Sequence, residues 1–194
     1  MQLNVLFLAV WVVWAISWIV AALWSRRTEA QLPPRQAWTY RIRVTSGALL
    51  LLLPRNERFL GTTRLWHIGF IEAHVLLLLT VLGIAFTWWA RIWLGPLWSS
   101  AVTRKEGHIV VDTGPYALVR HPIYTGILLA AFASGLAKAT ALGLCGVAVM
   151  AFGLWVKARC EENFLAAELP SDAYGAYRKR VPMLVPFLPP SARK

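Results

Sequence analysis

Cysteine is scarce in this chain of 194 residues, which contains two. Cys145 lies inside an apolar run and Cys160 stands beside Glu161, so the pair does not suggest a disulfide framework. No four Cys and His residues have the spacing of a zinc site, and the sequence predicts no metal centre. A G-x-G-x-x-G fingerprint is also missing, which argues against a dinucleotide-binding βαβ unit.

The sequence also lacks the marks of a cleaved signal peptide. Its start, MQLN followed by roughly twenty apolar residues, has neither a basic leading region nor a small-residue cleavage site. We therefore expect the first apolar run to remain as a membrane-spanning helix. No internal repeat, low-complexity linker or separate soluble domain is evident.

Acidic residues are few: nine Asp and Glu stand against 20 Lys and Arg, giving a net charge of +11. Such basicity can indicate a nucleic-acid partner. However, 58% of the residues are hydrophobic, 11 are tryptophan, and the mean hydropathy of +0.54 lies outside the usual range for a soluble domain. The composition therefore predicts an integral membrane protein.

Five apolar segments are candidates to cross a bilayer, whose core takes roughly twenty helical residues. They are residues 5–24, 37–53, 66–94, 122–136 and 139–156. The second is the weakest, because Arg41 and Arg43 lie near its start and Pro54 closes it; the third is long enough to tilt. We predict an all-α polytopic membrane protein of about five transmembrane helices, with residues 1–90 as an N-terminal transmembrane region and residues 91–194 containing a helical hairpin, 122–157.

The basic residues separate by side if these spans alternate in direction. All the Lys and Arg residues except Arg55, Arg58, Arg64 and Lys138 then share one side with the loop 95–121 and the C-terminus. The positive-inside rule places that side in the cytoplasm. Topology thus explains the basicity, and we expect no nucleic-acid partner.

Polar residues gather just before and just after the hairpin. Arg120 and His121 precede Pro122, which suits the first position of a helix, where free N–H groups and the helix dipole attract anions. Glu161 and Glu162 follow the hairpin. Adjacent residues cannot share one helix face, so at most one glutamate can enter a site; a solvated Lys157–Glu161 pair is the alternative interpretation.

Three ordered motifs surround the hairpin: GHIVVDTGPYALVRHPIYTG at 107–126, EENFL at 161–165 and YGAYRKRVP at 174–182. Together they resemble the isoprenylcysteine carboxyl methyltransferase family, whose wider group includes phospholipid N-methyltransferases. The resemblance covers roughly residues 90–188. It implies a membrane enzyme that binds S-adenosylmethionine at a cytosolic loop and methylates a lipid-linked or prenylated substrate.

The resemblance also implies the cofactor-binding positions, which are His108, Ile109, Val110, Val111, Tyr116, His121, Pro122, Tyr124 and Glu161. A family glutamine that contacts the cofactor falls on Ala101, and the family's substrate-contacting arginine falls on Lys157. Lysine lacks the planar fork that grips a carboxylate. Either Arg159 or Arg120 supplies that grip, or the acceptor is another group. The predicted catalytic residues are Glu161, Lys157, Arg120 and Arg159.

Several alternatives remain at this stage. An amine acceptor would need a base, for which Glu161, Glu162 and His121 are candidates. An NADPH-dependent sterol-type reductase and a non-catalytic membrane partner are the rival classes. All versions of the enzyme require that His121 and Glu161 meet in space.

Overall fold

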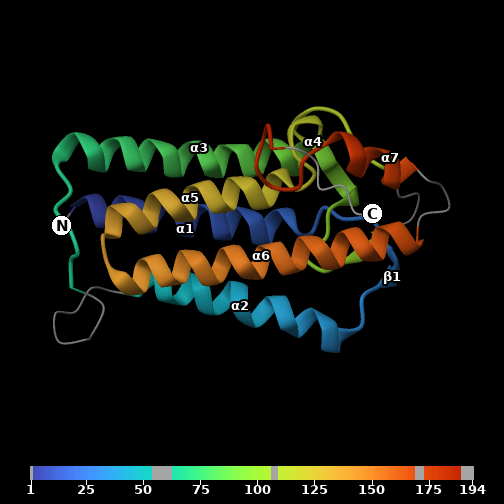
Figure 1. Cartoon of the computed structure of the whole chain (residues 1–194), viewed down its shortest axis with the longest axis horizontal. Coiled ribbons are helices and arrows are strands. Elements are labelled where there is room, and N and C mark those ends of the chain that lie inside the picture. Colours follow the sequence, from blue (N-terminus) through green and yellow to red (C-terminus); the bar gives the residue numbers. More distant parts are fainter. Residues whose placement is uncertain (1, 54–62, 106–108, 169–172, 189–194) are drawn as a thin grey trace.

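The computed structural model describes residues 2–53, 63–105, 109–168 and 173–188. The long helices of the described residues run along the long axis of the molecule (Figure 1). They are α1 (Gln2–Ala21), α2 (Pro34–Leu52), α3 (Phe70–Leu94), α5 (Pro122–Lys138) and α6 (Ala141–Glu168). The remaining elements are short: β1 (Thr28–Gln31), the 3-10 turn η1 (Gly95–Leu97), β2 (Thr103–Lys105), α4 (Pro115–Leu118) and α7 (Ala173–Arg180).

Each of the five predicted spans falls on one of the long helices, which confirms the all-α membrane fold. Three candidate spans, Asn4–Ala21, Phe70–Leu97 and Ala141–Glu168, are long and apolar enough to cross a bilayer by themselves. Helix α5 is apolar but shorter. Helix α2 carries Arg41 and Arg43 and was the weakest span in the sequence; it packs along α6, as α5 packs along α3.

The α2–α6 contact depends on small residues. A methyl group added at Gly146 would lie 2.7 Å from the carbonyl oxygen of Gly47, and one added at Gly47 would lie 2.6 Å from the backbone nitrogen of Met150. Both positions therefore require glycine for the two backbones to approach so closely. Close backbone packing is a main source of helix association in lipid, where the hydrophobic effect between helices is absent.

Helix α6 extends beyond the predicted membrane span. The apolar segment ends near residue 156, and the helix continues to Glu168 because KARCEENFLAAE contains no helix-breaking residue. Glu161 and Glu162 lie in this extension, near the end of the helix. Helix α3, by contrast, begins at Phe70, so Glu72 and His74 lie in its first turns and are exposed. The Nδ1 atom of His74 lies 2.7 Å from the carbonyl oxygen of Phe70 in the same helix.

The alternation of the helices brings the segments 22–33, 95–105, 109–121, 157–168 and 173–188 to one end of the bundle, which we call the site end (Figure 1). Here β1 pairs antiparallel with β2, so the N-terminal region fastens the loop between α3 and α5. Arg91, fully buried on α3, donates to the carbonyls of Ala21 and Trp24 at 2.7 Å and thereby ties the end of α1 to α3. The loop includes β2 and the helical turn α4.

Candidate functional site

The start of α5 is the first half of the site. His121 occupies the N-cap position with a non-helical backbone, and Pro122 begins the helix. The short helix α4 precedes it and is entered through Gly114, whose φ of 57° lies in the left-handed region that favours glycine. These turns place Tyr116, His121 and Tyr124 around one cavity.

Helix α6 supplies the second half through two adjacent glutamates that leave the helix in different directions. Glu161 lines the cavity, whereas the Glu162 side chain is completely buried beside Arg120. Of the two adjacent glutamates, Glu161 therefore faces the cavity and Glu162 does not. The His121 ring lies between the two: its Nδ1 is 3.4 Å from Glu161 Oε2, and its Nε2 is 3.3 Å from Glu162 Oε1. The ends of the hairpin therefore meet.

Arg120 joins three elements at this point. Its Nε donates to Glu162 Oε1 at 2.7 Å, while its Nη1 donates to the carbonyls of Arg178, in the last turn of α7, and of Val181, just after that helix. The Arg120 side chain is 1% exposed. These contacts make Arg120 a link between α5, α6 and the C-terminal segment. Arg120 also lines the cavity, and its buried Nη2 has no hydrogen-bond partner among the described residues.

The two carboxylates determine the charge of His121. Burial lowers the pKa of the imidazole, but hydrogen bonds to Glu161 and Glu162, together with the charges of these groups, raise it by more. The pKa therefore lies above the ordinary histidine value. A protonated ring, which donates from both nitrogens, suits the two carboxylates that it faces.

Aromatic rings complete the surroundings of Glu161. Tyr124 donates its hydroxyl to Glu161 Oε1 at 2.6 Å, and its ring stacks on His121 with centroids 5.3 Å apart. Lys157 lies one turn before Glu161 on α6; its ammonium is 5.1 Å from the Tyr124 ring centroid and 5.6 Å from that of Tyr40 on α2. It donates to the carbonyl of Ser100 at 3.0 Å. A cation thus sits beside the cavity, between two tyrosine rings.

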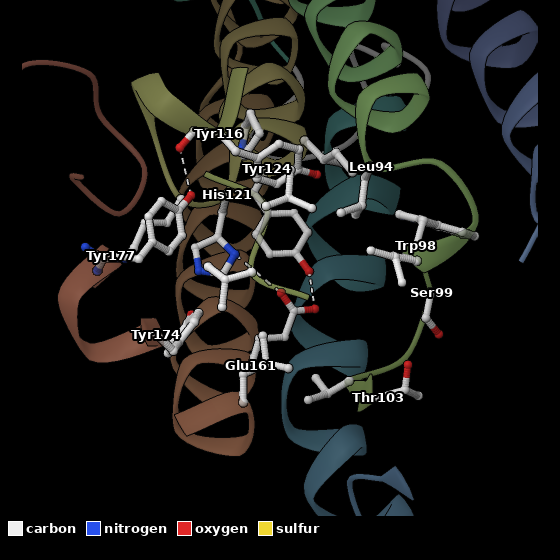
Figure 2. A pocket seen from close by; sticks show the side chains of 18 of the residues that line it. Leu94, Trp98, Ser99, Thr103, Tyr116, His121, Tyr124, Glu161, Tyr174 and Tyr177 are labelled. Carbon is white, nitrogen blue, oxygen red and sulfur yellow. Dashed lines mark hydrogen bonds and ion pairs between the residues drawn. The ribbon is translucent and has the colours of Figure 1, made fainter. Parts of the chain in front are cut away.

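The cavity has about 880 Å³ of empty space, including the part open to solvent. Figure 2 shows Glu161, His121 and Tyr124 meeting in the middle of the view, with Tyr174 and Tyr177 on the left and Trp98, Ser99 and Thr103 on the right. The predicted cofactor residues that line it are Ile109, Val110, Val111, Tyr116, His121, Pro122, Tyr124 and Glu161, and Ala101 lines it too. His108 lies outside the described residues.

Helix α7 covers the cavity with two buried tyrosines. Tyr177 donates to the carbonyl of Tyr116 at 2.8 Å, and Tyr174 packs at 6.1 Å from Tyr177, measured between ring centroids. Burial raises the pKa of both phenols above the ordinary value, so they stay neutral at physiological pH. The place of Tyr174 and Tyr177 in the third motif is the sequence signal that could have assigned them to the cavity.

Two of the predicted catalytic residues, Arg159 and Lys157, are not among the residues that line the cavity. Arg159 points along α6 to the Trp155 ring, 5.4 Å from its centroid, and does not line the cavity. Lys157 is at the cavity's edge rather than among its lining residues. Sequence reasoning missed Trp98, Ser99 and Thr103, which lie in the stretch that β1 holds down, and Tyr40, which reaches Lys157 from a helix without a recognisable motif.

Comparisons with known proteins agree with this geometry. The sequence model of the isoprenylcysteine carboxyl methyltransferase (ICMT) family matches residues 75–167, which include α5, most of α6 and the loop before them. The cobalt-zinc-cadmium resistance protein CzcN of Cupriavidus metallidurans is 32% identical over 166 residues, covering 84% of this chain and 69% of that protein.

Two other relatives are more distant. The protein-S-isoprenylcysteine O-methyltransferase of Schizosaccharomyces pombe is 27% identical over 89 residues, 46% of this chain and 38% of the yeast protein. The nickel-cobalt-cadmium resistance protein NccN of Alcaligenes xylosoxydans xylosoxydans is 27% identical over 125 residues, 63% of this chain and 55% of that protein. On these matches and the motifs around its hairpin, the chain belongs to the isoprenylcysteine carboxyl methyltransferase family.

Proposed function

We propose that this protein is an S-adenosylmethionine-dependent membrane methyltransferase that esterifies the carboxylate of an isoprenylcysteine-like or other lipid-linked acceptor. The observation that carries the proposal is the contact of His121 and Tyr124 with Glu161 in a cavity at the end of a membrane hairpin. Family membership supports the reaction class. The excess of basic residues at the site end supports a cytoplasmic orientation.

The residues of the cavity fit a cationic cofactor. Glu161 is 19% exposed, and its carboxylate uses part of its acceptor capacity on Tyr124 and His121, which leaves room to pair with an ammonium group. The rings of Tyr116 and Tyr124 offer faces to a cation, and the loop backbone at Ile109, Val110 and Val111 offers peptide groups. When bound, the cofactor would supply an electrophilic methyl group on a sulfonium.

The acceptor needs no general base if it is a carboxylate, because that group is already ionised at neutral pH. The protein's contribution is then alignment and removal of water. Lys157 is the cation best placed to orient an acceptor carboxylate, since it lies between Tyr40 and Tyr124 at the cavity's edge. Arg120 acts first as a positioning residue, because Glu162 and two carbonyls hold its Nε and Nη1 atoms; its Nη2 has no partner among the described residues and lies where Arg120 lines the cavity.

The names of two relatives describe metal resistance, which is a phenotype and not an acceptor. Among residues 2–53, 63–105, 109–168 and 173–188, no group of three or more His, Cys, Asp and Glu side chains could hold a metal ion. We therefore propose that any link to metals runs through the methylated product, whose identity must be found by experiment.

The test uses the purified full chain in lipid nanodiscs with methyl-labelled S-adenosylmethionine and lipid extract. We expect label in the lipid fraction that alkali releases, as from a methyl ester; alkali-stable label would overturn carboxyl methylation in favour of an amine acceptor. The Glu161→Gln variant should weaken cofactor binding by roughly ten- to a hundredfold, the loss of a charge-assisted hydrogen bond of about 1.5–3 kcal/mol.

Asp112→Asn is the matched control for this test. Asp112 is an acidic residue at the same end that pairs with Arg180 at the surface, 2.7 Å away, and we expect its variant to bind normally. Wild-type protein that binds no S-adenosylmethionine and yields no label would refute the proposal. Saturable NADPH binding in its place would favour a reductase.

A further inference from the structure

The chain after α7 turns back toward the bundle instead of leaving it. The backbone N–H groups of Arg120 and His121 donate to the carbonyls of Pro182 and Met183 at 2.8 and 3.1 Å. One turn further into α5, the hydroxyl of Thr125 donates to the carbonyl of Leu184 at 2.6 Å. Figure 1 shows this segment, in red, lying beside α4 and the start of α5. The segment therefore advances along α5 toward the membrane-spanning part of the bundle.

The side chains of this segment divide into two groups. Met183 and Leu184 pack against the core of the bundle. The next apolar side chains do not: Val185 is 54% exposed, Phe187 96% and Leu188 55%. Phe187 also has a φ of 65°, in the left-handed region that bulky residues rarely adopt, and this turn directs its ring outward. Three large apolar groups are thus presented together beside the first turn of α5.

Lipid is the partner that this position favours. The segment runs along the mouth of an apolar hairpin, and Ile92 and Trp93 expose apolar side chains in the last turn of α3 at the same end. Tryptophan near the end of a spanning helix is typical of the membrane interface. Lys179 and Arg180 on α7 are exposed just before the segment, as in interfacial elements whose cations face the headgroups.

The same segment is fastened to the candidate site. Tyr174 and Tyr177 on α7 line the cavity, and Arg120 donates hydrogen bonds to the carbonyls of Arg178 and Val181. Any force that holds residues 185–188 in place therefore also holds α7 over the cavity. We infer that residues 185–188 form an interfacial anchor, inserted in the headgroup–acyl boundary of the bilayer, that keeps α7 closed over the cavity. The second half of this inference depends on the proposed function.

The anchor can be tested without any cofactor. A spin label is attached at Phe187→Cys in the full chain carrying Cys145→Ser and Cys160→Ala, in phosphatidylcholine nanodiscs. We expect the label to be accessible to oxygen and shielded from a water-soluble nickel chelate, at a depth of about 5–10 Å below the headgroups. A label at Gln31→Cys, exposed on β1, is the aqueous control. Position 187 open to the chelate, or shielded from both reagents as under a protein partner, would overturn the anchor.

The coupling to the site is tested with the triple variant Val185→Ser, Phe187→Ser and Leu188→Ser. We expect it to weaken S-adenosylmethionine binding in nanodiscs by about fivefold or more, the usual range of coupling between sites. Leu23→Ser, an exposed leucine just after α1, is the matched control and should bind as the wild type does. Unchanged affinity in the triple variant would overturn the coupling. Failure of the wild-type protein to bind would instead refute the proposed function, while leaving the depth measurement intact.

Discussion

Replacement of Glu162 by glutamine tests whether the buried pair with Arg120 supports the fold. The Glu162 side chain is 0% exposed; it accepts from Arg120 Nε at 2.7 Å and also faces His121 at 3.3 Å and Arg178 at 3.4 Å. Removing one partner of a buried ion pair costs about 3–5 kcal/mol, because the other charge stays buried without compensation. Glutamine retains an acceptor oxygen for Arg120, so we take the lower value, about 3 kcal/mol.

In a chain of this size each kcal/mol shifts Tm by about 2–4 °C, so Glu162→Gln should lower Tm by about 6–12 °C. The control is Asp112→Asn. The Asp112–Arg180 pair has the same 2.7 Å separation but side chains that are 39% and 65% exposed, and such surface pairs contribute at most about 1 kcal/mol. Thermal unfolding in detergent at one fixed scan rate measures both variants. Equal shifts in the two would refute the reasoning, because burial would then make no difference.

Three further variants test the charge of His121, the glycine contact between α2 and α6, and the role of Lys157. His121→Gln should flatten the pH dependence of Tm. Because the pKa of His121 is raised in the folded protein, the stabilisation from its protonated ring is complete below about pH 6.5, the unfolded value, and is lost as pH rises through the folded pKa. The wild-type Tm should therefore fall toward pH 9, while the Tm of the variant stays level. Gly146→Ala should lower Tm by about 3–10 °C, despite alanine's higher helix propensity, because the methyl group meets the Gly47 backbone; Gly69→Ala, where the neighbour is the flexible Glu72 side chain, should not. Lys157→Met should raise the KM for a carboxylate acceptor and leave the cofactor Kd unchanged, each measured in a separate titration. If the variant weakened acceptor and cofactor binding equally, Lys157 would not belong to the acceptor site.

The parts of the fold that sequence predicted depend on local signals. An apolar run of roughly twenty residues fixes a span, and the Pro122 start of α5 fixes where Arg120 and His121 stand. A short connection between two spans makes a hairpin, so the residues before and after it share one side. From these facts alone, the meeting of His121 with Glu161 could be anticipated.

The parts that sequence missed depend on contacts between distant segments. Pairing of β1 with β2 joins residues about 75 positions apart, and no local pattern marks it. Tyr40 approaches Lys157 only because glycines let α2 lie close against α6. The cover provided by α7 depends on Arg120 reaching carbonyls about 60 positions later in the chain. The burial of Tyr174 and Tyr177 on α7 is a tertiary effect, which overrides the preference of an amphipathic ring for the membrane interface.

The division between Glu161 and Glu162 shows how one turn of helix can serve the fold and the site separately. Neighbouring residues on a helix point about 100° apart, so Glu162 faces Arg120 and the C-terminal segment while Glu161 faces the cavity. His121 contacts both and therefore transmits the position of one carboxylate to the other. A change at Glu162 must then reach the site through His121, whereas a change at Glu161 alters the cavity first. Because Glu161 is partly exposed and Glu162 is fully buried, Glu161→Gln should lose cofactor affinity at a nearly unchanged Tm, and Glu162→Gln should lose both.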